Sequence, residues 1–197
     1  MINKENLTRD YLPETDIFLY QDRNMFRVNT DTHLLGNFLK VKKGEIILDI
    51  GVNNGALLLY ANQYQPAKMV GVDIQVSACE LANLNMQDHQ INNVEIHCSD
   101  IRDFTYLPVD VIICNPPYFN EENTNLSLEK RIARNEIHLP LQDLFQAIRR
   151  LLKEKGRCYL IHRVNRLNEI YRALLENDLN IREMTLVYDE NHEYAHG

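Results

Sequence analysis

The sequence lacks the segments that would place a protein in a membrane or in a secretory pathway. No apolar run approaches the ~20 residues that a helix needs to cross a bilayer, and the polar start Met1–Asn6 is unlike a secretory signal. The four cysteines form no C-x-x-C pair, so a spacing common in zinc and redox sites is also absent. These absences predict a cytoplasmic protein with reduced, buried thiols.

Internal repeats and low-complexity stretches are absent too, and the composition is that of a globular protein. Of the 197 residues, 45% are hydrophobic and 25% are charged, which excludes a collagen-like, coiled-coil or largely disordered chain. Asn29–Thr32 reads as a helix N-cap ahead of the apolar Leu34 and Leu35. We therefore expect residues 1–40 to form an N-terminal cap, packed on a single globular domain of residues 41–197.

Charge is unevenly distributed along the chain. The net charge is -7, which argues against a protein that coats nucleic acid without selection. Residues 130–172, however, contain 11 of the 21 Lys and Arg residues and only 4 of the 28 Asp and Glu residues. Such a basic sector can bind a phosphate backbone locally, or it can be a solvated helix surface. Charge alone leaves both interpretations open.

Short runs of β-branched and apolar residues alternate with helical patterns. Runs that are apolar throughout are typical of parallel strands covered on both faces. The predicted strands are Glu45–Ile50, Met69–Val72, Val94–Cys98, Asp110–Cys114, Arg157–His162 and Thr185–Val187. This alternation predicts an α/β fold, a doubly wound sheet with helices on both faces. Ligands bind such sheets at the carboxyl ends of the strands.

A glycine-containing turn follows the first of these strands. The strand ends at Leu48-Asp49-Ile50, and the turn Gly51–Gly55 leads into a helix. Glycines let a ligand approach the backbone closely, and the helix N-terminus offers free N–H groups. The next two strands end at Asp73 and Asp100, which suit the hydroxyls of a ribose and the amino group of an adenine. Together these residues predict a nucleotide-type pocket.

Two cofactors compete for this pocket. A nicotinamide dinucleotide site has the fingerprint G-x-G-x-x-G. It fits poorly, because Asn53 and Ala56 stand where glycines are needed after Gly51. The alternative is S-adenosylmethionine, since the methyltransferases that use it end the first strand with an acidic residue and a glycine-rich turn.

The most specific feature follows the predicted strand Asp110–Cys114, which leads into Asn115-Pro116-Pro117-Tyr118. Two prolines restrict the backbone and remove two N–H donors. They hold the carbonyl of Pro116 towards the site, while the side-chain oxygen of Asn115 is a second acceptor. Tyr118 offers a flat face on which a planar base can stack. The alternative is that the motif has only a structural role, as a rigid turn after a buried strand.

Two acceptors that face one amino group would bind both of its hydrogens. They would direct the nitrogen lone pair towards an electrophile, and the proton would leave after the methyl group arrives, so no general base is needed first. A base bound in this way has to leave its stack, which suits a loop or a single strand. We therefore predict methyl transfer to an amino group, with Asn115, Pro116 and Tyr118 as the catalytic residues.

With both motifs placed, the sequence resembles class I S-adenosylmethionine-dependent methyltransferases that act on exocyclic or amide nitrogen. More closely, it resembles the bacterial valine-tRNA (adenine-N6) methyltransferase family, which modifies the adenosine beside the anticodon. The resemblance extends from about Tyr11 to about Tyr188. The matching stretches are Gln21…Phe26…Asp31-Thr32-His33-Leu34-Leu35, Leu48-Asp49-Ile50-Gly51, Gly71-Val72-Asp73-Ile74-Gln75, Ala78…Ala82…Asn85, Asn115-Pro116-Pro117-Tyr118-Phe119, Ala133-Arg134-Asn135-Glu136 and His162-Arg163…Arg166-Leu167.

The resemblance implies a Rossmann-like class I methyltransferase fold, S-adenosylmethionine as the cofactor and the anticodon loop of tRNA as the substrate. The implied cofactor-binding residues are Asp49, Gly51, Asn53, Gly55, Asp73, Ile74, Asp100, Ile101 and Asn115. Within that set, Asp49 and the two glycines would line the methionine end. Asp73 would bind the ribose, and Asp100 with Ile101 would frame the adenine. The implied substrate-binding residues are Pro117, Phe119, Arg134, Arg163 and Arg166.

Two features depart from the family pattern. The family's turn is D-x-G-x-G-x-G, and Asn53 stands at its middle glycine. Asparagine tolerates a left-handed backbone better than most residues. Family members also continue into a final strand that inserts antiparallel beside the fifth strand, where this chain has only Asn191–Gly197. We therefore expect this final edge strand to be missing.

Other functions remain open from the sequence. N-P-P-Y also occurs in enzymes that methylate glutamine in release factors, guanine in ribosomal RNA or adenine in DNA, and a non-catalytic RNA-binding derivative of the fold is a further class. The basic sector favours RNA. His192–His196 matches the zinc motif H-E-x-x-H, but the second histidine is the penultimate residue, so no helix continues and no third ligand follows. We expect no metal and no membrane partner.

Overall fold

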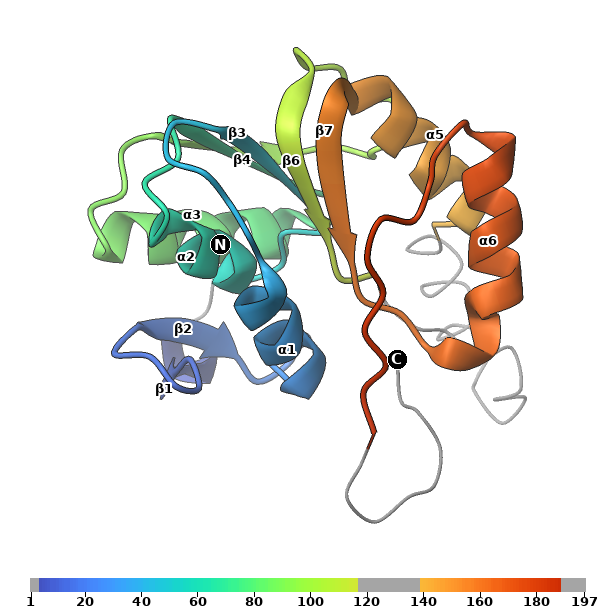
Figure 1. Ribbon diagram of the computed structural model, residues 1–197. Helices are drawn as coiled ribbons and strands as arrows, with labels where there is room; N and C mark the ends of the chain where they lie inside the picture. Colours follow the sequence, from blue (N-terminus) through green and yellow to red (C-terminus); the bar gives the residue numbers. More distant parts are fainter. Residues whose placement is uncertain (1–3, 117–138, 189–197) are drawn as a thin grey trace. The chain divides into compact units, whose positions relative to one another are not determined.

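The computed structural model describes residues 4–116 and 139–188 of the chain (Figure 1). The chain forms two compact units. We call the first the sheet unit, which consists of Met1–Asn115 and Arg150–Ile161, and the other the second unit, which consists of Pro116–Arg149 and His162–Gly197. The predicted domain boundary at residue 40 stays a prediction.

The sheet unit contains five parallel strands in the order β5-β4-β3-β6-β7. The strands are β3 (Ile46–Ile50), β4 (Lys68–Asp73), β5 (Val94–Cys98), β6 (Val109–Cys114) and β7 (Leu152–Leu160). Because the strand order reverses after β5, β3 lies in the centre of the sheet between β4 and β6. This arrangement confirms the predicted α/β fold, a central parallel sheet flanked by helices.

The central strands and their helices are apolar on the surfaces that they bury. Ile47 on β3 and Ile113 on β6 are 0% exposed, as expected for parallel strands that are covered on both faces. Two crossover helices, α2 (Ala56–Asn62) and α3 (Val76–Asp88), lie on the same side of the sheet (Figure 1). α2 is buried from Ala56 to Ala61 and carries no charge, the pattern of a helix without a solvent face.

The N-terminal residues form a hairpin and a helix within the sheet unit. The elements are η1 (Lys4–Asn6), β1 (Leu7–Tyr11), β2 (Phe18–Asp22) and α1 (Thr30–Phe38), with β1 and β2 antiparallel. The Asn29 side-chain oxygen accepts a hydrogen bond from the Thr32 backbone N–H at 2.9 Å. This bond satisfies one free donor of the first turn, and it confirms the predicted start of the helix.

One buried amide joins three parts of the sheet unit. Asn85 on α3 is 0% exposed. Its Nδ2 donates to the carbonyls of Tyr20 at 2.9 Å and Asn54 at 2.8 Å, and its Oδ1 accepts from the Tyr20 N–H at 2.7 Å. The side chain therefore connects β2 and the turn after β3 to α3. Buried polar groups need such partners, so Asn85 holds the hairpin against that turn.

The last strand differs from its predicted extent. β7 was expected over Arg157–His162, but it begins at Leu152, which already pairs with Val109. The next partners are Val111 and Arg157, so the register shifts and residues 153–156 form an irregular bulge. An apolar pattern does not reveal such an extension, because residues 153–157 are mostly charged.

The regular elements described in the second unit are helices, and residues 177–188 follow them without a helix. The unit contains η2 (Val164–Arg166), α6 (Leu167–Glu176) and all of α5 (Leu141–Leu151) except its last two residues. The predicted strand Thr185–Val187 is wrong, because residues 181–187 form no strand in the described part of the chain. A β-branched run forms a strand only where a neighbouring strand pairs with it. The missing final edge strand stays a prediction.

We expect Asn85→Ala to destabilise the protein strongly. The substitution leaves the Tyr20 and Asn54 backbone groups buried without their partner, at a cost of about 1–3 kcal/mol for each unsatisfied group. Urea unfolding measures the free energy of unfolding directly. Asn83→Ala is the matched control, because Asn83 is exposed on the same helix. Equal stability of the two variants would contradict the role given to Asn85.

Candidate cofactor and amine-binding site

The candidate site lies where three neighbouring strands end. β3 pairs with both β4 and β6, and Ile50 at its end is in register with Val72 on one side and Cys114 on the other. Asp49, Asp73 and Asn115 follow from this register at the carboxyl edge of the sheet. Three of the predicted site residues, far apart in the sequence, are therefore brought to one edge.

The turn after β3 has the backbone that the glycines predicted. Gly51, Asn53 and Gly55 all have positive φ angles, of 76°, 47° and 81°. A Cβ on Gly51 would meet no atom within 4 Å, so its requirement for glycine is conformational. Asn53 adopts the left-handed conformation, as expected of asparagine. Its Nδ2 also donates to the carbonyl of Phe26 at 2.7 Å, a contact that glycine could not make.

Asp73 at the end of β4 is held by the same turn. Its Oδ2 accepts from the Asn53 N–H at 3.0 Å and its Oδ1 from the Gln75 N–H at 2.9 Å. Burial raises the pKa of Asp73, and these backbone hydrogen bonds partly oppose that rise. The carboxylate is thus fixed in orientation, and each oxygen retains a lone pair that can accept a ribose hydroxyl.

Asp49 has an unusual environment. It is 1% exposed, and neither carboxylate oxygen has a hydrogen-bond partner among the described residues. Burial, followed by the negative charge of Asp73, raises the pKa of Asp49 well above its usual value. A buried carboxylate without a partner is costly. S-adenosylmethionine carries an ammonium and a sulfonium group, so an unpaired acid beside the turn fits this cationic ligand.

The predicted adenine end is occupied by an internal ion pair. The Asp100 carboxylate accepts from Arg102 Nε at 3.0 Å and also from its Nη2. This hydrogen bonding lowers the pKa of Asp100. Arg150 donates to the carbonyl of the buried Ile101 at 2.9 Å and so fixes the following loop. An adenine amino group would share Asp100 with Arg102, and the adenine roles of Asp100 and Ile101 stay predictions.

Asn115 is oriented by a directed chain of hydrogen bonds. The Thr32 hydroxyl donates its only proton to Asn29 Oδ1 at 3.0 Å. It must therefore accept from Asn115, which requires the amide nitrogen, and Asn115 Nδ2 lies 3.3 Å from Thr32 Oγ1. This series of hydrogen bonds determines which end of the Asn115 amide is the donor. Thr32 had no predicted role, and its place in the Asp31-Thr32-His33 stretch was the only signal.

A second missed residue supports the glycine turn from the N-terminal side. Gln21 is 4% exposed. Its Oε1 accepts from the Val28 N–H at 2.6 Å and from Asn54 Nδ2 at 3.4 Å. Together with the bond between Asn53 and Phe26, it ties the segment before α1 to the turn. Its place at the head of the Gln21…Phe26 stretch was the only signal, because a lone glutamine is usually a surface residue.

The structure does not test the site roles of the remaining predicted residues. Pro116 is buried at the end of the described segment. Four others lie outside the described residues: Pro117, Tyr118, Phe119 and Arg134. Arg163 and Arg166 belong to the second unit, where Arg166 pairs with Glu169 at 2.6 Å. Ile74, beside Asp73, is 43% exposed, and its cofactor contact stays a prediction.

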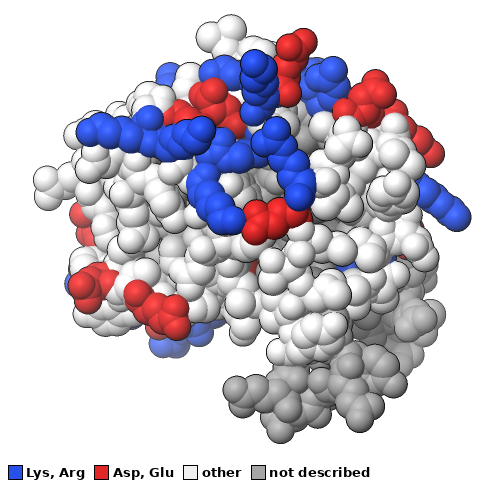
Figure 2. All heavy atoms as spheres, in the orientation of Figure 1, with Lys and Arg blue, Asp and Glu red and all other residues white. Residues whose placement is uncertain are grey.

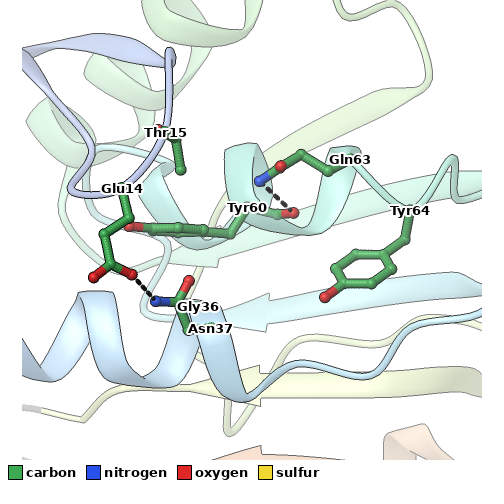
Figure 3. Close-up of a pocket in the computed structure, with 7 residues that line it drawn as sticks. All are labelled: Glu14, Thr15, Gly36, Asn37, Tyr60, Gln63 and Tyr64. Carbon is green, nitrogen blue, oxygen red and sulfur yellow. Dashed lines mark hydrogen bonds between the residues drawn. The ribbon is translucent and has the colours of Figure 1, made fainter.

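A cavity of about 270 Å³ lies elsewhere in the sheet unit (Figure 3). It is lined by Glu14, Thr15, Gly36, Asn37, Tyr60, Gln63 and Tyr64. Its polar groups bond to one another: Asn37 Nδ2 donates to Glu14 at 3.2 Å, and Gln63 donates to the Tyr60 carbonyl at 3.5 Å. None of these residues belongs to the predicted site, so this cavity is not the candidate cofactor pocket.

Metal ligands and membrane spans give no further candidates. In residues 4–116 and 139–188, no three His, Cys, Asp or Glu side chains are grouped so that they could hold a metal ion. The H-E-x-x-H stretch at 192–196 lies outside the described residues. None of the described helices is long and apolar enough to cross a bilayer.

Comparison with known proteins agrees with this fold. The model of the family described as "Methyltransferase domain" matches residues 41–195. A tRNA1(Val) (adenine(37)-N6)-methyltransferase from Cytophaga hutchinsonii is 29% identical over 86% of this chain and 73% of its own. Proteins of the same name from Shewanella baltica and Shewanella halifaxensis are 31% and 34% identical, over 80% and 68% of this chain and 69% and 56% of theirs.

Solved structures show the same architecture. A ribosomal protein L11 methylase from Lactobacillus delbrueckii subsp. bulgaricus superposes with a TM-score of 0.58 at 21% identity, over 83% of this chain and 78% of its own. An S-adenosylmethionine-dependent O-methyltransferase from Thermotoga maritima also has a TM-score of 0.58, at 19% identity, over 88% of this chain and 60% of its own. At these identities the likeness concerns the fold alone.

Fold, site and family match together define a class I methyltransferase, with S-adenosylmethionine as its cofactor. Within that class, the chain belongs to the family of the tRNA1(Val) (adenine(37)-N6)-methyltransferases. Both assignments confirm what the sequence predicted. The chain spans only part of its relatives, from 56% to 73% of the lengths of the three described above.

We expect Asp49→Asn to stabilise the cofactor-free protein and to weaken cofactor binding. Because the pKa of Asp49 is raised on folding, its contribution to stability is complete below the unfolded value of 3.8 and is lost as the pH rises. The variant's excess free energy of unfolding should therefore grow as the pH rises above about 4. Urea unfolding at several pH values measures it.

The same variant should bind S-adenosylmethionine at least roughly tenfold more weakly, since a charge-assisted contact is lost. Calorimetry with the cofactor measures this affinity. Asp16→Asn is the control, because Asp16 is exposed, and it should change neither quantity. Unchanged affinity in Asp49→Asn would show that Asp49 does not act on the positive charge of the cofactor.

Proposed function

We propose that this protein transfers a methyl group from S-adenosylmethionine to the exocyclic N6 amine of an adenine in tRNA. The target that we infer is the adenosine beside the anticodon of valine tRNA, in the anticodon loop. The names of its relatives support this acceptor over the release-factor, ribosomal RNA and DNA alternatives. We further propose that the protein acts in the cytoplasm and needs no metal.

One observation supports the chemistry most directly, the fixed orientation of Asn115. Its Nδ2 is committed to Thr32, so its Oδ1 is the end that serves as an acceptor for an amine. The carbonyl of Pro116 is the second proposed acceptor. Together they hold both hydrogens of the adenine amine and direct the nitrogen lone pair towards the cofactor. Tyr118 remains the proposed stacking surface for the base.

The cofactor, when bound, supplies an electrophilic methyl carbon on a sulfonium centre. In the proposed transfer, the adenine nitrogen held by Asn115 and Pro116 would form the new N–C bond as the S–C bond gave its electron pair to sulfur, and one amine proton would then pass to solvent. Asn53 N–H and Gln75 N–H keep the Asp73 carboxylate oriented towards the ribose. An ionised Asp49 would favour the cationic cofactor over its neutral-sulfur product.

The proposal is tested by incubating the protein with S-adenosylmethionine and a valine tRNA transcript, followed by mass spectrometry of the nucleosides. We expect N6-methyladenosine at the position beside the anticodon. Asn115→Ala should lower turnover at least about 10²-fold, because an interaction with the reacting amine is lost, and should leave cofactor affinity within about threefold. Asn83→Ala is the control for the protein's integrity. Equal loss of turnover and cofactor binding would contradict the role of Asn115.

Thr32 is expected to act as a positioning residue. Thr32→Val removes the hydroxyl that orients Asn115 and should lower kcat roughly tenfold, the value of one net hydrogen bond. Thr32→Ser retains the hydroxyl and should restore kcat. Steady-state kinetics with tRNA separate kcat from KM. A lower kcat in both variants, or a higher KM with an unchanged kcat, would assign Thr32 a structural role instead.

A further inference from the structure

A basic surface lies at the amino edge of the sheet, the edge opposite the candidate site. It contains Lys40, Lys42, Lys43, Lys153, Lys155 and Arg157. The first three precede β3, Lys153 and Lys155 lie in the bulge at the start of β7, and Arg157 follows that bulge. Lys and Arg side chains gather visibly over the upper part of the face in Figure 2. We call these six residues the amino-edge surface.

Hydrogen bonds establish that the two segments of the amino-edge surface are neighbours. The Arg157 guanidinium donates to the carbonyl of Lys40 at 3.1 Å through Nε, and to Glu45 at 2.6 Å through Nη2. Lys153 pairs with Asp110 at 2.7 Å, and the same carboxylate accepts from the Ile46 N–H at 3.0 Å. Residues more than a hundred positions apart therefore form one surface.

The charge of this surface is opposite to that of the whole chain. Six basic side chains stand beside three acidic ones, Glu45, Asp110 and Glu154, on a protein whose net charge is -7. Arg157 and Lys153 are paired with carboxylates. In the described part of the chain, no hydrogen bond or ion pair involves the ammonium groups of the exposed Lys42, Lys43 and Lys155. These three charges are available to a polyanion.

We propose that the amino-edge surface binds the phosphate backbone of tRNA outside the anticodon stem-loop. This inference rests on the proposed function, which places the reacting base at the carboxyl edge. Strands of five or six residues separate the two edges by roughly 20 Å, at about 3.3 Å per residue. A whole tRNA is much longer than this separation, whereas an isolated loop is not. Contacts of the lysines with phosphates would orient the tRNA on the protein and strengthen its binding, without recognising the base sequence.

The test compares the affinity of two RNAs, full-length valine tRNA and its isolated anticodon stem-loop, by fluorescence anisotropy at several salt concentrations. Lys42→Gln combined with Lys43→Gln should weaken binding of full-length tRNA about three- to tenfold and reduce the salt slope by about 1 to 2. Binding of the stem-loop, cofactor affinity and kcat at saturating tRNA should not change. The control combines Asn83→Asp with Gln87→Glu, two exposed positions on α3, and changes net charge equally.

The outcomes separate the two proposals. Unchanged binding of full-length tRNA by the lysine variant, or an equal loss in the control, would overturn the amino-edge surface while leaving methylation intact. Binding that depends on Lys42 and Lys43 without any methylated product would support the surface and overturn the proposed function. An equal loss for the stem-loop would place these lysines at the anticodon instead, and would also overturn the proposal.

Discussion

The pairing of β3 with both β4 and β6 is the constraint on which the site depends. Parallel strands in register end together, and the central strand brings its own turn beside the ends of both neighbours. Asp73 consequently accepts a hydrogen bond from the turn after β3, and Asn115 emerges on the other side of that turn. Asp49, Asp73 and Asn115 all lie at strand ends, so the relative placement of these three residues follows from the sheet.

Hydrogen bonds orient the side chains that the sheet brings to the site. Thr32 has one proton, which it gives to Asn29, and this commits the Asn115 amide to one orientation. Asn85 supports the same region from α3 by joining β2 to the turn. Both sets of hydrogen bonds connect the N-terminal segment to the strand ends. The residues before β3 are thus part of the site's support, since they hold groups that would otherwise rotate.

Charge is distributed between the two edges of the sheet. Acidic residues with raised pKa values, Asp49 and Asp73, are buried at the carboxyl edge, where the proposed contact with a cationic cofactor would stabilise them. Exposed lysines lie at the amino edge, where a polyanion can reach them. The acids lie in the interior, which suits a small ligand, and the basic residues lie on the surface, which suits a large one. A net charge of -7 for the chain conceals this separation.

Local patterns in the sequence determined the strands, the glycine turn and the Asn-Pro-Pro-Tyr motif, because apolar runs and backbone-restricting residues act over a few positions. The left-handed conformation of Asn53 was also predictable. The extension of β7 and the absence of a strand at Thr185–Val187 were not, because strand pairing depends on partners distant in the chain. The lack of a partner for Asp49 and the meeting of residues 40–43 with 153–157 were decided only by tertiary structure. Burial and contact between remote segments have no signature in a linear pattern.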